Sequence, residues 1–282
     1  MIHRLTVVGV GLLGGSVAKA ARARGLAREI VGVGRDAGRL RPALVEGALD
    51  HATTDLAAGV READFVVLAA PVQTLERLLP AVWAAAAPDA VITDVGSTKA
   101  TIVEAAERLG AGRPLAFVGS HPMAGSEQSG YGVARADLFT GATVIVTPTE
   151  STEPRAAKGV TVFWESLGAH VAVLDPRTHD RVVAAISHLP HLVAYALVEA
   201  AARAEPSALD FAARGFKDTT RIAASDPDVW REIFLDNRPA LRQSLAAFRA
   251  ALDEVERLVE AGDAARLQAW LAAAKARREG VR

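Results

Sequence analysis

Apolar residues in the first part of the chain are grouped in short, nearly continuous runs. Runs of about four to eight apolar residues between helical stretches are typical of strands buried on both faces of a parallel sheet. Beyond Asp175-Pro176 this signal ends, and the spacing is helical to the end. We therefore expect an α/β domain with a doubly wound sheet over residues 1–175 and an all-helical domain over residues 176–282. The expected strands are Leu5–Val10, Glu29–Val33, Phe65–Ala70, Ala90–Thr93, Leu115–Val118, Thr143–Thr147 and Val171–Leu174.

Two helices of the second half have distinctive patterns. Thr178–Ala204 has the pattern of one long helix, and Pro190 within it removes a backbone hydrogen bond and predicts a kink. In the last long helix, apolar residues alternate spacings of four and three. Such a heptad seam packs lengthwise against a partner, in the same chain or in a second subunit, so we expect a homodimer formed through helices. The seam consists of Leu241, Leu245, Phe248, Leu252, Val255 and Val259.

Glycines follow the first expected strand in the pattern Gly-x-Gly-x-x-Gly and lead directly into an alanine-rich helix. Gly9 makes the tight turn, Gly11 lets a pyrophosphate approach the backbone, and Gly14 lets the helix pack on the strand. The phosphates would lie on the free N–H groups at the start of the helix. This context predicts a Rossmann-type dinucleotide site. Its expected contacts are Gly9, Gly11, Leu12, Leu13, Gly14, Ala70 and Pro71.

The end of the second strand bears on which dinucleotide binds. About 20 residues after the fingerprint, an acidic residue usually holds the ribose hydroxyls of NAD, whereas an arginine suits the 2′-phosphate of NADP. Gly34 takes the expected acidic position and Arg35 follows it, which favours NADP. Asp36 leaves NAD open, because a small shift in register would make it the acidic residue. It can equally cap the next helix.

Composition and charge narrow the class of protein. With 282 residues, the chain is long enough for two domains, and its net charge of −1 gives no electrostatic reason to bind nucleic acid or an anionic membrane. The absence of cysteine excludes disulfides and thiolate chemistry. No uninterrupted apolar run reaches the roughly 18 residues of a membrane helix. The chain enters a strand at once, without room for a signal peptide, so we expect a cytoplasmic protein.

Polar residues that can do chemistry follow two of the expected strands. His121 lies just before Pro122 in the loop Val118–Gly130, and Ser97 follows the strand Ala90–Thr93. Ligands bind at the carboxyl ends of such strands. A histidine near neutral pH is a candidate acid or base, although a loop histidine held by local hydrogen bonds is the plainer interpretation. Ser97 can cap a helix and still bind a ligand.

Two further groups lie in the helical half. Ser187 and His191 share one face across the expected kink, which suits substrate contact or a buried histidine, whereas zinc lacks a third nearby ligand. Lys217 and Arg221 are four residues apart. In a helix they form one cationic face for a carboxylate, with Asp218 as a balancing partner. A solvated charged turn is the alternative.

Four motifs in this order resemble the prephenate/arogenate dehydrogenase family, the oxidoreductases of tyrosine biosynthesis. With the glycine fingerprint they cover essentially the whole chain. The resemblance implies a Rossmann-type domain followed by an all-α substrate and dimerisation domain, a 6-phosphogluconate-dehydrogenase-like arrangement. The motifs are Asp94-Val95-Gly96-Ser97-Thr98-Lys99, His121-Pro122-Met123-Ala124-Gly125-Ser126-Glu127, Ser187-His188-Leu189-Pro190-His191 and Gly215-Phe216-Lys217-Asp218-Thr219-Thr220-Arg221.

The resemblance also implies roles for single residues. His121 would hydrogen-bond the ring hydroxyl of the substrate, and Ser97 would orient His121 and touch the same hydroxyl. Arg221 would bind the ring carboxylate. The other implied substrate contacts are Ser126, Lys217, Ser187 and His191, together with Glu127 as a gate and Trp230 as a residue contributed by the neighbouring subunit.

The implied reaction is the NAD(P)-dependent oxidative decarboxylation of prephenate to 4-hydroxyphenylpyruvate. Hydride leaves the carbinol carbon while His121 takes the hydroxyl proton, a general-base contribution of about 10²–10⁴-fold. CO2 leaves because the ring becomes aromatic, so neither a metal nor a second cofactor is implied. Since no regulatory domain is expected beside these two, inhibition by tyrosine would act at the active site.

Three alternatives remain open. Arogenate could be the substrate and give tyrosine directly. Glu127 favours prephenate, whereas Arg35 favours NADP, which many arogenate enzymes use. A β-hydroxyacid dehydrogenase would share the two-domain layout but needs a lysine within Thr178–Ala204, where none occurs. A protein that senses NADP without turnover would have no need of His121.

Overall fold

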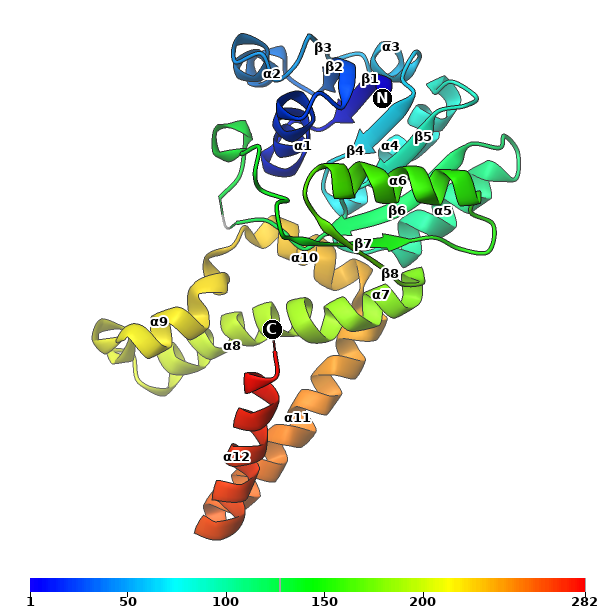
Figure 1. Cartoon of the computed structure of the whole chain (residues 1–282). Helices are drawn as coiled ribbons and strands as arrows, with labels where there is room; N and C mark the ends of the chain where they lie inside the picture. The colour runs from blue at the N-terminus through cyan, green and yellow to red at the C-terminus, as the bar shows by residue number, and fades with distance from the viewer. Residues whose placement is uncertain (127, 282) are drawn as a thin grey trace.

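A sheet flanked by helices forms one end of the molecule, and a set of helices forms the other, in a computed structural model that describes residues 1–126 and 128–281 (Figure 1). The eight strands have the order β3-β2-β1-β4-β5-β6-β7-β8. Strands β1 to β6 are parallel, β7 is antiparallel to β6, and β8 is parallel to β7. The order reverses between β1 and β4, where doubly wound sheets bind ligands. The strands are β1 (Ile2–Val8), β2 (Ala27–Val33), β3 (His51–Thr53), β4 (Phe65–Leu68), β5 (Val91–Asp94), β6 (Ala116–Pro122), β7 (Thr143–Thr147) and β8 (His170–Val173).

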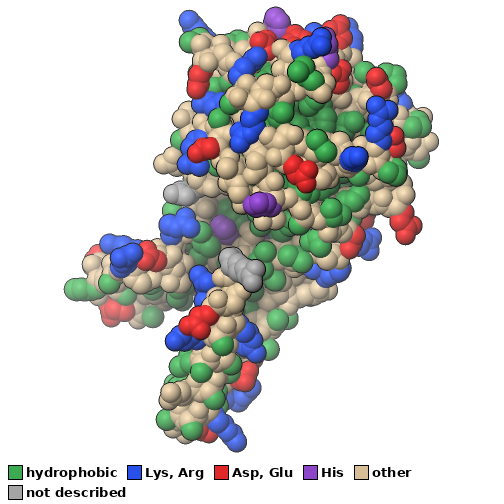
Figure 2. All heavy atoms as spheres, viewed as in Figure 1, with side chains coloured by type: hydrophobic (Ala, Val, Ile, Leu, Met, Phe, Trp, Pro, Cys, Tyr) green, Lys and Arg blue, Asp and Glu red, His purple; other side chains and the backbone are tan. Residues whose placement is uncertain are grey.

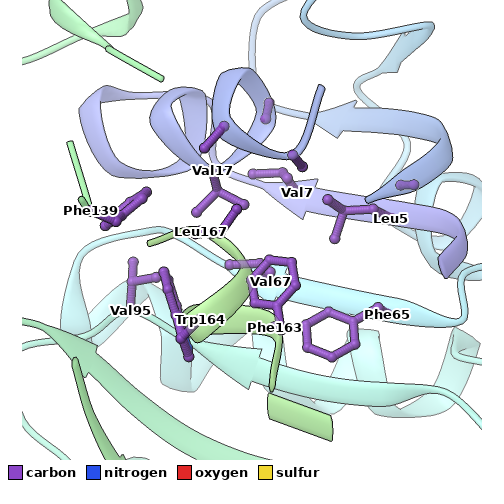
Figure 3. Close-up of a cluster of buried hydrophobic side chains, with 14 of the residues drawn as sticks. Leu5, Val7, Val17, Phe65, Val67, Val95, Phe139, Phe163, Trp164 and Leu167 are labelled. Carbon is purple, nitrogen blue, oxygen red and sulfur yellow. The ribbon is translucent and has the colours of Figure 1, made fainter. Parts of the chain in front are cut away.

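Helices cover both faces of the sheet because its central strands are apolar on both faces. Side chains alternate along β4, so that Phe65 and Val67 pack on one face while Val66 and Leu68 pack on the other. On the first face, the Phe65 ring stacks on Phe163 at a centroid distance of 4.6 Å (Figure 3). The first face is covered by α1 (Leu12–Ala23), α2 (Ala37–Val45) and α6 (Pro154–Ser166), and the second by α3 (Leu56–Val60), α4 (Val72–Ala85) and α5 (Ala100–Gly110).

The strand that carries His121 is longer than its apolar run predicts. Its last four residues, from Gly119 to Pro122, pair with the antiparallel strand β7, and His121 lies opposite Ile145. The partner strand holds these small and polar residues in the ladder, and Pro122 is tolerated because it ends the strand. The prediction that His121 lies in a loop is therefore wrong. Its ring projects from a strand, which is a more rigid support.

The long apolar helix of the second half is interrupted by one wide turn. It consists of α7 (Pro176–Val183), a π-helical turn (Ala184–His188) and α8 (Leu189–Ala204). Pro190 lies in the first turn of α8, so the irregularity precedes it, as expected where the proline N–H is missing from the hydrogen-bond ladder.

The same stretch, Pro176–Ala204, is long and apolar enough to cross a membrane by length and composition, with a mean hydropathy of 1.5. The span contains no uninterrupted apolar run, because histidine, serine and proline interrupt it, while alanine and valine keep its mean hydropathy high. Only 22% of the apolar window is buried. Near its start, His179 and Asp180 form hydrogen bonds with the sheet domain.

The remaining helices follow α8, and the last two of them extend away from the sheet (Figure 1). Leu241, at the start of the predicted seam, is buried, whereas Leu252 and Val259 are 47% and 61% exposed. Apolar side chains are correspondingly visible on the surface of the projecting pair of helices (Figure 2). The seam is therefore covered at one end and open at the other. These helices are α9 (Arg214–Thr220), α10 (Pro227–Asp236), α11 (Arg238–Glu260) and α12 (Ala264–Glu279).

Candidate active site

The three fingerprint glycines meet three different spatial demands. Gly9 has a φ of +97°, and a Cβ there would lie 2.3 Å from the Ala69 carbonyl oxygen. A Cβ at Gly14 would lie 1.9 Å from the Gly9 carbonyl oxygen. A Cβ at Gly11 would meet nothing within 4 Å, so the space beside that backbone is open. Protein atoms thus fill the space beside Gly9 and Gly14, whereas Gly11 borders open space of the kind that a pyrophosphate needs.

The N-terminus of α1 suits an anion. Its N-cap is Gly11, no side chain caps it, and its first turn has no acidic residue. Its first N–H groups are therefore available for phosphate oxygens, as in other helix-terminal anion sites. Ala70 and Pro71 lie just beyond β4, whose neighbour β1 leads into Gly9, and the Ala69 N–H donates to the Val8 carbonyl (2.7 Å). The expected cofactor residues thus converge at the sheet's switch point.

Asp36 and Arg35 differ in what they can offer a ribose. The Asp36 carboxylate caps α2 by accepting from the Gly38 N–H at 2.7 Å. Arg35 is exposed just past the end of β2. The capping role considered for Asp36 is confirmed, and its carboxylate is already engaged in the helix cap. Arg35 thus offers an exposed cation just past the end of β2, at the cofactor end of the strand.

His121 is the first member of a buried hydrogen-bonded chain that joins the two halves of the molecule. Its Nδ1 lies 2.9 Å from His179 Nε2, and His179 Nδ1 lies 2.8 Å from Asp180 Oδ1. The Asp180 carboxylate also accepts from the backbone N–H groups of Lys99 at 2.8 Å and Ala100 at 2.9 Å. Asp180 on α7 therefore caps α5 of the sheet domain and holds His179 against His121.

The Asp180 carboxylate determines the tautomers along this chain. Its oxygens accept, so His179 Nδ1 carries the proton that it donates to Asp180, and Nε2 of a neutral His179 is left to accept. His121 Nδ1 then donates to His179, and His121 Nε2 keeps its lone pair. Burial, reinforced by the nearby charge of Lys99, holds the pKa of His121 well below its ordinary value. Burial also lowers the pKa of His179. Both rings are thus neutral at pH 7.

Ser97 forms no hydrogen bond to the His121 ring among the described residues. It is half-buried just before Lys99, and His121 Nδ1 contacts His179 instead. The orienting role expected of Ser97 stays a prediction, as does its contact with a substrate hydroxyl.

A buried ion pair supports the strand ends beneath His121. Lys99 Nζ binds the Asp94 carboxylate, and both side chains are fully buried. Lys99 also donates to the Ser120 carbonyl at 3.0 Å, while Asp94 accepts from the Ser120 N–H at 3.2 Å. Burial lowers the pKa of Lys99, an effect that the Asp94 charge opposes. The pair joins β5 to β6 at the residue before His121.

The predicted substrate residues of the helical half form a second cluster. The His191 ring stacks on Trp230 with a centroid distance of 3.5 Å and an interplanar angle of 20°. His191 Nδ1 lies 2.9 Å from the Ser187 carbonyl oxygen. Burial lowers the pKa of His191, and the nearby charge of Arg221 lowers it further. The structure thus brings Ser187, His191, Arg221 and Trp230 together within one chain.

Asn237 and His188 connect the two clusters. Asn237 Nδ2 donates to the Asp180 carbonyl at 2.8 Å and lies 3.1 Å from His188 Nδ1. Burial lowers the pKa of His188 to about 4. The His188 ring also lies edge-on to Trp230 at 6.1 Å. The chain from His121 therefore continues to the stacked rings through buried polar contacts.

Sequence reasoning missed His179, Asp180 and Asn237. The first two were absorbed into the pattern of an ordinary long helix. They lie in the polar stretch of residues 177–181, so the sequence does not separate them from a solvated helix start. Asn237 offers no signal either, since its role depends on where α10 meets α11.

Other predicted residues are less closely placed. Lys217 is exposed on α9, and Arg221 begins a 3₁₀ turn (Arg221–Ala224), so one continuous helix does not carry both. Asp218 pairs with Arg214 at 3.3 Å rather than with the predicted partners, because that spacing fits within α9. Ser126 is exposed, and its hydroxyl accepts from the Gln128 N–H at 3.2 Å. Glu127 lies outside the described residues.

Metal ligands are not gathered at this site. Over residues 1–126 and 128–281, no group of three or more histidine or carboxylate side chains is placed to hold an ion. The site instead offers neutral imidazoles, a helix terminus for phosphate, and cations of the helical half.

Comparison with known proteins covers both halves of the chain. Residues 17–173 match the family model of the prephenate dehydrogenase nucleotide-binding domain, and residues 175–273 match that of the prephenate dehydrogenase dimerization domain. A prephenate dehydrogenase from Bacillus subtilis is 36% identical over 285 residues, which is 100% of this chain and 76% of that protein.

Solved structures agree with this result. The prephenate dehydrogenase of Aquifex aeolicus in complex with hydroxyphenyl propionate and NAD+ has a TM-score of 0.93 and 34% identity, covering 100% of this chain and 99% of that one. Synechocystis arogenate dehydrogenase has a TM-score of 0.82 and 33% identity, covering 98% and 99%. The predicted family and fold class are confirmed. This chain belongs to the prephenate dehydrogenase family and is an NAD(P)-dependent oxidoreductase.

Proposed function

We propose that the enzyme oxidises and decarboxylates prephenate to 4-hydroxyphenylpyruvate, with His121 as the general base. The observation that carries this proposal is the chain from His121 through His179 to Asp180, which leaves a lone pair on His121 Nε2. A neutral imidazole with a defined tautomer is the state that a base needs. Within the described residues, that nitrogen forms no hydrogen bond and so is left for the substrate hydroxyl.

The reaction needs one proton acceptor and one hydride acceptor. A bound nicotinamide supplies the hydride acceptor at the switch point of the sheet. His121 Nε2 takes the proton of the ring hydroxyl as hydride leaves the same carbon, and the carbon becomes a ketone. The bond to the carboxylate then breaks and CO2 leaves. The electron pair of that bond moves through the ring onto the ketone oxygen, which makes the ring aromatic and leaves a phenolate. The phenolate takes back the proton held by His121, so the protein's task is to hold the ring and to accept and return one proton.

His179 and Asp180 stabilise the positive charge that this step creates. When His121 Nε2 gains a proton, the ring becomes an imidazolium whose Nδ1–H already donates to His179. His179 is polarised in turn by the Asp180 carboxylate. A buried cation without such a partner would be costly, so this chain makes proton transfer to a buried base feasible.

The helical half supplies the opposite end of the site. We propose that Arg221 binds the ring carboxylate, that Ser187 and His191 contact the side chain of the substrate, and that Ser97, Ser126, Glu127 and Lys217 complete the pocket. The stacking of His191 on Trp230 supports this assignment because it fixes the ring beside Arg221. Trp230 packs on His191 of its own chain, and a contribution of Trp230 to the pocket of a neighbouring subunit stays a prediction.

NADP is the proposed preferred cofactor, and arogenate is the second candidate substrate. The exposed Arg35 and the engaged carboxylate of Asp36 support NADP over NAD. The 33% identity to Synechocystis arogenate dehydrogenase supports arogenate as the second candidate substrate, which would give tyrosine directly. The two substrates differ only in an amino or a keto group on the side chain.

Assembly and location complete the proposal. We propose a homodimer through the helical domain, residues 176–282, because Leu252, Val259 and Leu271 are 47%, 61% and 52% exposed. The matched dimerization-domain model supports the same assembly.

We propose a soluble cytoplasmic enzyme without nucleic-acid or membrane partners. Tyrosine would inhibit it by competing at the active site, and inhibition non-competitive with the substrate would contradict this.

One assay tests the main proposal. The purified enzyme is mixed with prephenate or arogenate, each with NAD or NADP, and reduced nicotinamide is followed by absorbance. We expect turnover with prephenate and a higher kcat/KM with NADP than with NAD. Turnover with arogenate alone would assign the second candidate substrate, and no signal in any of the four mixtures would refute the proposal.

A further inference from the structure

The segment between β6 and β7 is an exposed loop held at both ends. Its described residues from Gly125 to Gly130 are exposed, whereas Tyr131 is only 7% exposed. At the front, the Met123 N–H donates to the Thr143 carbonyl at 2.8 Å. At the back, the chain turns through Gly130, whose φ is +94°, into the short 3₁₀ turn that begins with Tyr131. Tyr131 is thus the point where the loop returns to the protein core.

Tyr131 joins the loop to two helices of the cofactor domain. Its hydroxyl donates to Glu46 Oε2 at 2.7 Å, at the end of α2. Lys19 of α1 lies 3.0 Å from Glu46 Oε1 and 4.6 Å from the centre of the Tyr131 ring. Burial raises the pKa of Tyr131, so its hydroxyl remains a donor at physiological pH. The hydrogen bond from Tyr131 in turn lowers the pKa of Glu46.

The contact with α1 depends on Gly15, the residue after the fingerprint. A Cβ on Gly15 would lie 2.7 Å from Tyr131 Cδ2 and 2.9 Å from Ala134 Cβ. The next residue, Ser16, is buried and accepts from the Arg135 N–H at 3.0 Å. The absence of a side chain at Gly15 therefore lets the loop pack against α1, whereas Gly9, Gly11 and Gly14 shape the cofactor turn. The loop therefore packs on the first turns of α1, whose N-terminus is the proposed site for the dinucleotide phosphates.

We propose that Tyr131 is a positioning residue that sets the affinity for the substrate by anchoring this loop to α1 and α2. The proposal rests on the function proposed above, in which Ser126 of the loop contacts substrate. Without the anchor, the free segment would extend further along the chain, and ordering it on binding would cost more entropy. The chemical step itself uses His121 on a strand, which the anchor does not touch. Substrate KM should therefore change more than kcat.

The test uses Tyr131→Phe, which removes the bond to Glu46 but keeps the ring, and Gly15→Ala, which pushes a methyl group into that ring. Gly132→Ala is the matched control, because it makes the same change in the same segment where a Cβ would meet nothing within 4 Å. Each variant is assayed for kcat and substrate KM, and its dinucleotide Kd is measured by calorimetry without substrate.

We expect Tyr131→Phe to raise the substrate KM about three- to tenfold, with kcat and dinucleotide Kd changed less than about twofold. Gly15→Ala should raise the KM at least as much, and Gly132→Ala should leave it unchanged. A purely structural role would lower the melting temperature and the active fraction without moving KM. An unchanged KM in a folded Tyr131→Phe variant would overturn the inference. Inactive wild-type protein would instead refute the proposed function.

Discussion

His121 Nδ1 lies 2.9 Å from His179 Nε2, and this contact crosses from strand β6 of the sheet domain to helix α7 of the helical domain. The two rings are set at 65° to each other, so the contact is along the ring edge rather than by stacking. Because Asp180 holds the far side of His179, the position of the base depends on both halves of the chain. The domain junction is therefore part of the catalytic apparatus that we propose.

Replacing His121 by asparagine should abolish turnover and spare the cofactor. Asparagine keeps a polar side chain in the strand but cannot accept a proton, so kcat should fall by about 10²–10⁴-fold. Dinucleotide Kd, measured by calorimetry, should stay within about twofold because the fingerprint turn is untouched. His170→Asn is the control, since His170 is an exposed histidine on β8. Equal activity of the two variants would contradict a catalytic role and favour a sensor.

Removal of His179 should slow the reaction while leaving substrate binding nearly intact. In His179→Phe the ring volume remains but His121 loses its orienting partner, and we expect kcat to fall about 10–100-fold with little change in KM. His179→Gln, whose amide oxygen can accept from His121, should recover part of the loss. Steady-state kinetics of both variants test this. A KM effect as large as the kcat effect would indicate a binding role instead.

The sequence predicted the cofactor end of the site more fully than the catalytic end. Gly9, Gly11 and Gly14 serve a local turn, so their spacing alone indicates the geometry that the structure shows. His179 reaches His121 across 58 positions of sequence, and its partner Asp180 reaches the start of α5 from a different domain. Such contacts depend on how α7 packs, which local hydrophobic patterns do not encode. The strand β3 was not predicted because its three residues are too few to show an apolar run.

The pH dependence of kcat/KM should show an acid limb below pH 6.5. Burial lowers the pKa of His121 from its ordinary value, so the free enzyme keeps its base neutral to a lower pH than an exposed histidine would. Activity governed by His121 should therefore be flat from about pH 6.5 to pH 8 and fall only on further acidification. Initial rates at low substrate concentration measure this profile. An acid limb centred above pH 6.5 would assign the base to another group.

Acid should destabilise the fold through the buried histidines. Burial lowers the pKa of His188 to about 4, whereas an unfolded chain has the ordinary value near 6.5. Between these pH values the unfolded state binds a proton that the folded state does not, so stability falls as pH falls. At pH 4, His188 alone should account for about 3 kcal/mol of lost stability. Urea unfolding of wild type and His188→Asn from pH 8 to pH 4 should show a shallower decline in the variant; parallel curves would contradict the assignment.

The choice of dinucleotide should depend on Arg35. It is exposed beyond β2, and Oδ1 of the neighbouring Asp36 carboxylate caps α2 by accepting from the Gly38 N–H, so Arg35 is the cation that a 2′-phosphate would meet at this edge of the sheet. Arg35→Ala should raise the KM for NADP about tenfold, because one charge-assisted contact is lost, and leave the KM for NAD nearly unchanged. Arg28→Ala is the control, since this exposed arginine lies near the start of the same strand, away from the cofactor turn. A tenfold effect on both cofactors would mean that Arg35 supports the turn itself. If Arg35→Ala changes the KM of neither cofactor, Arg35 does not bind the 2′-phosphate, and this edge of the sheet would instead recognise the ribose hydroxyls of NAD.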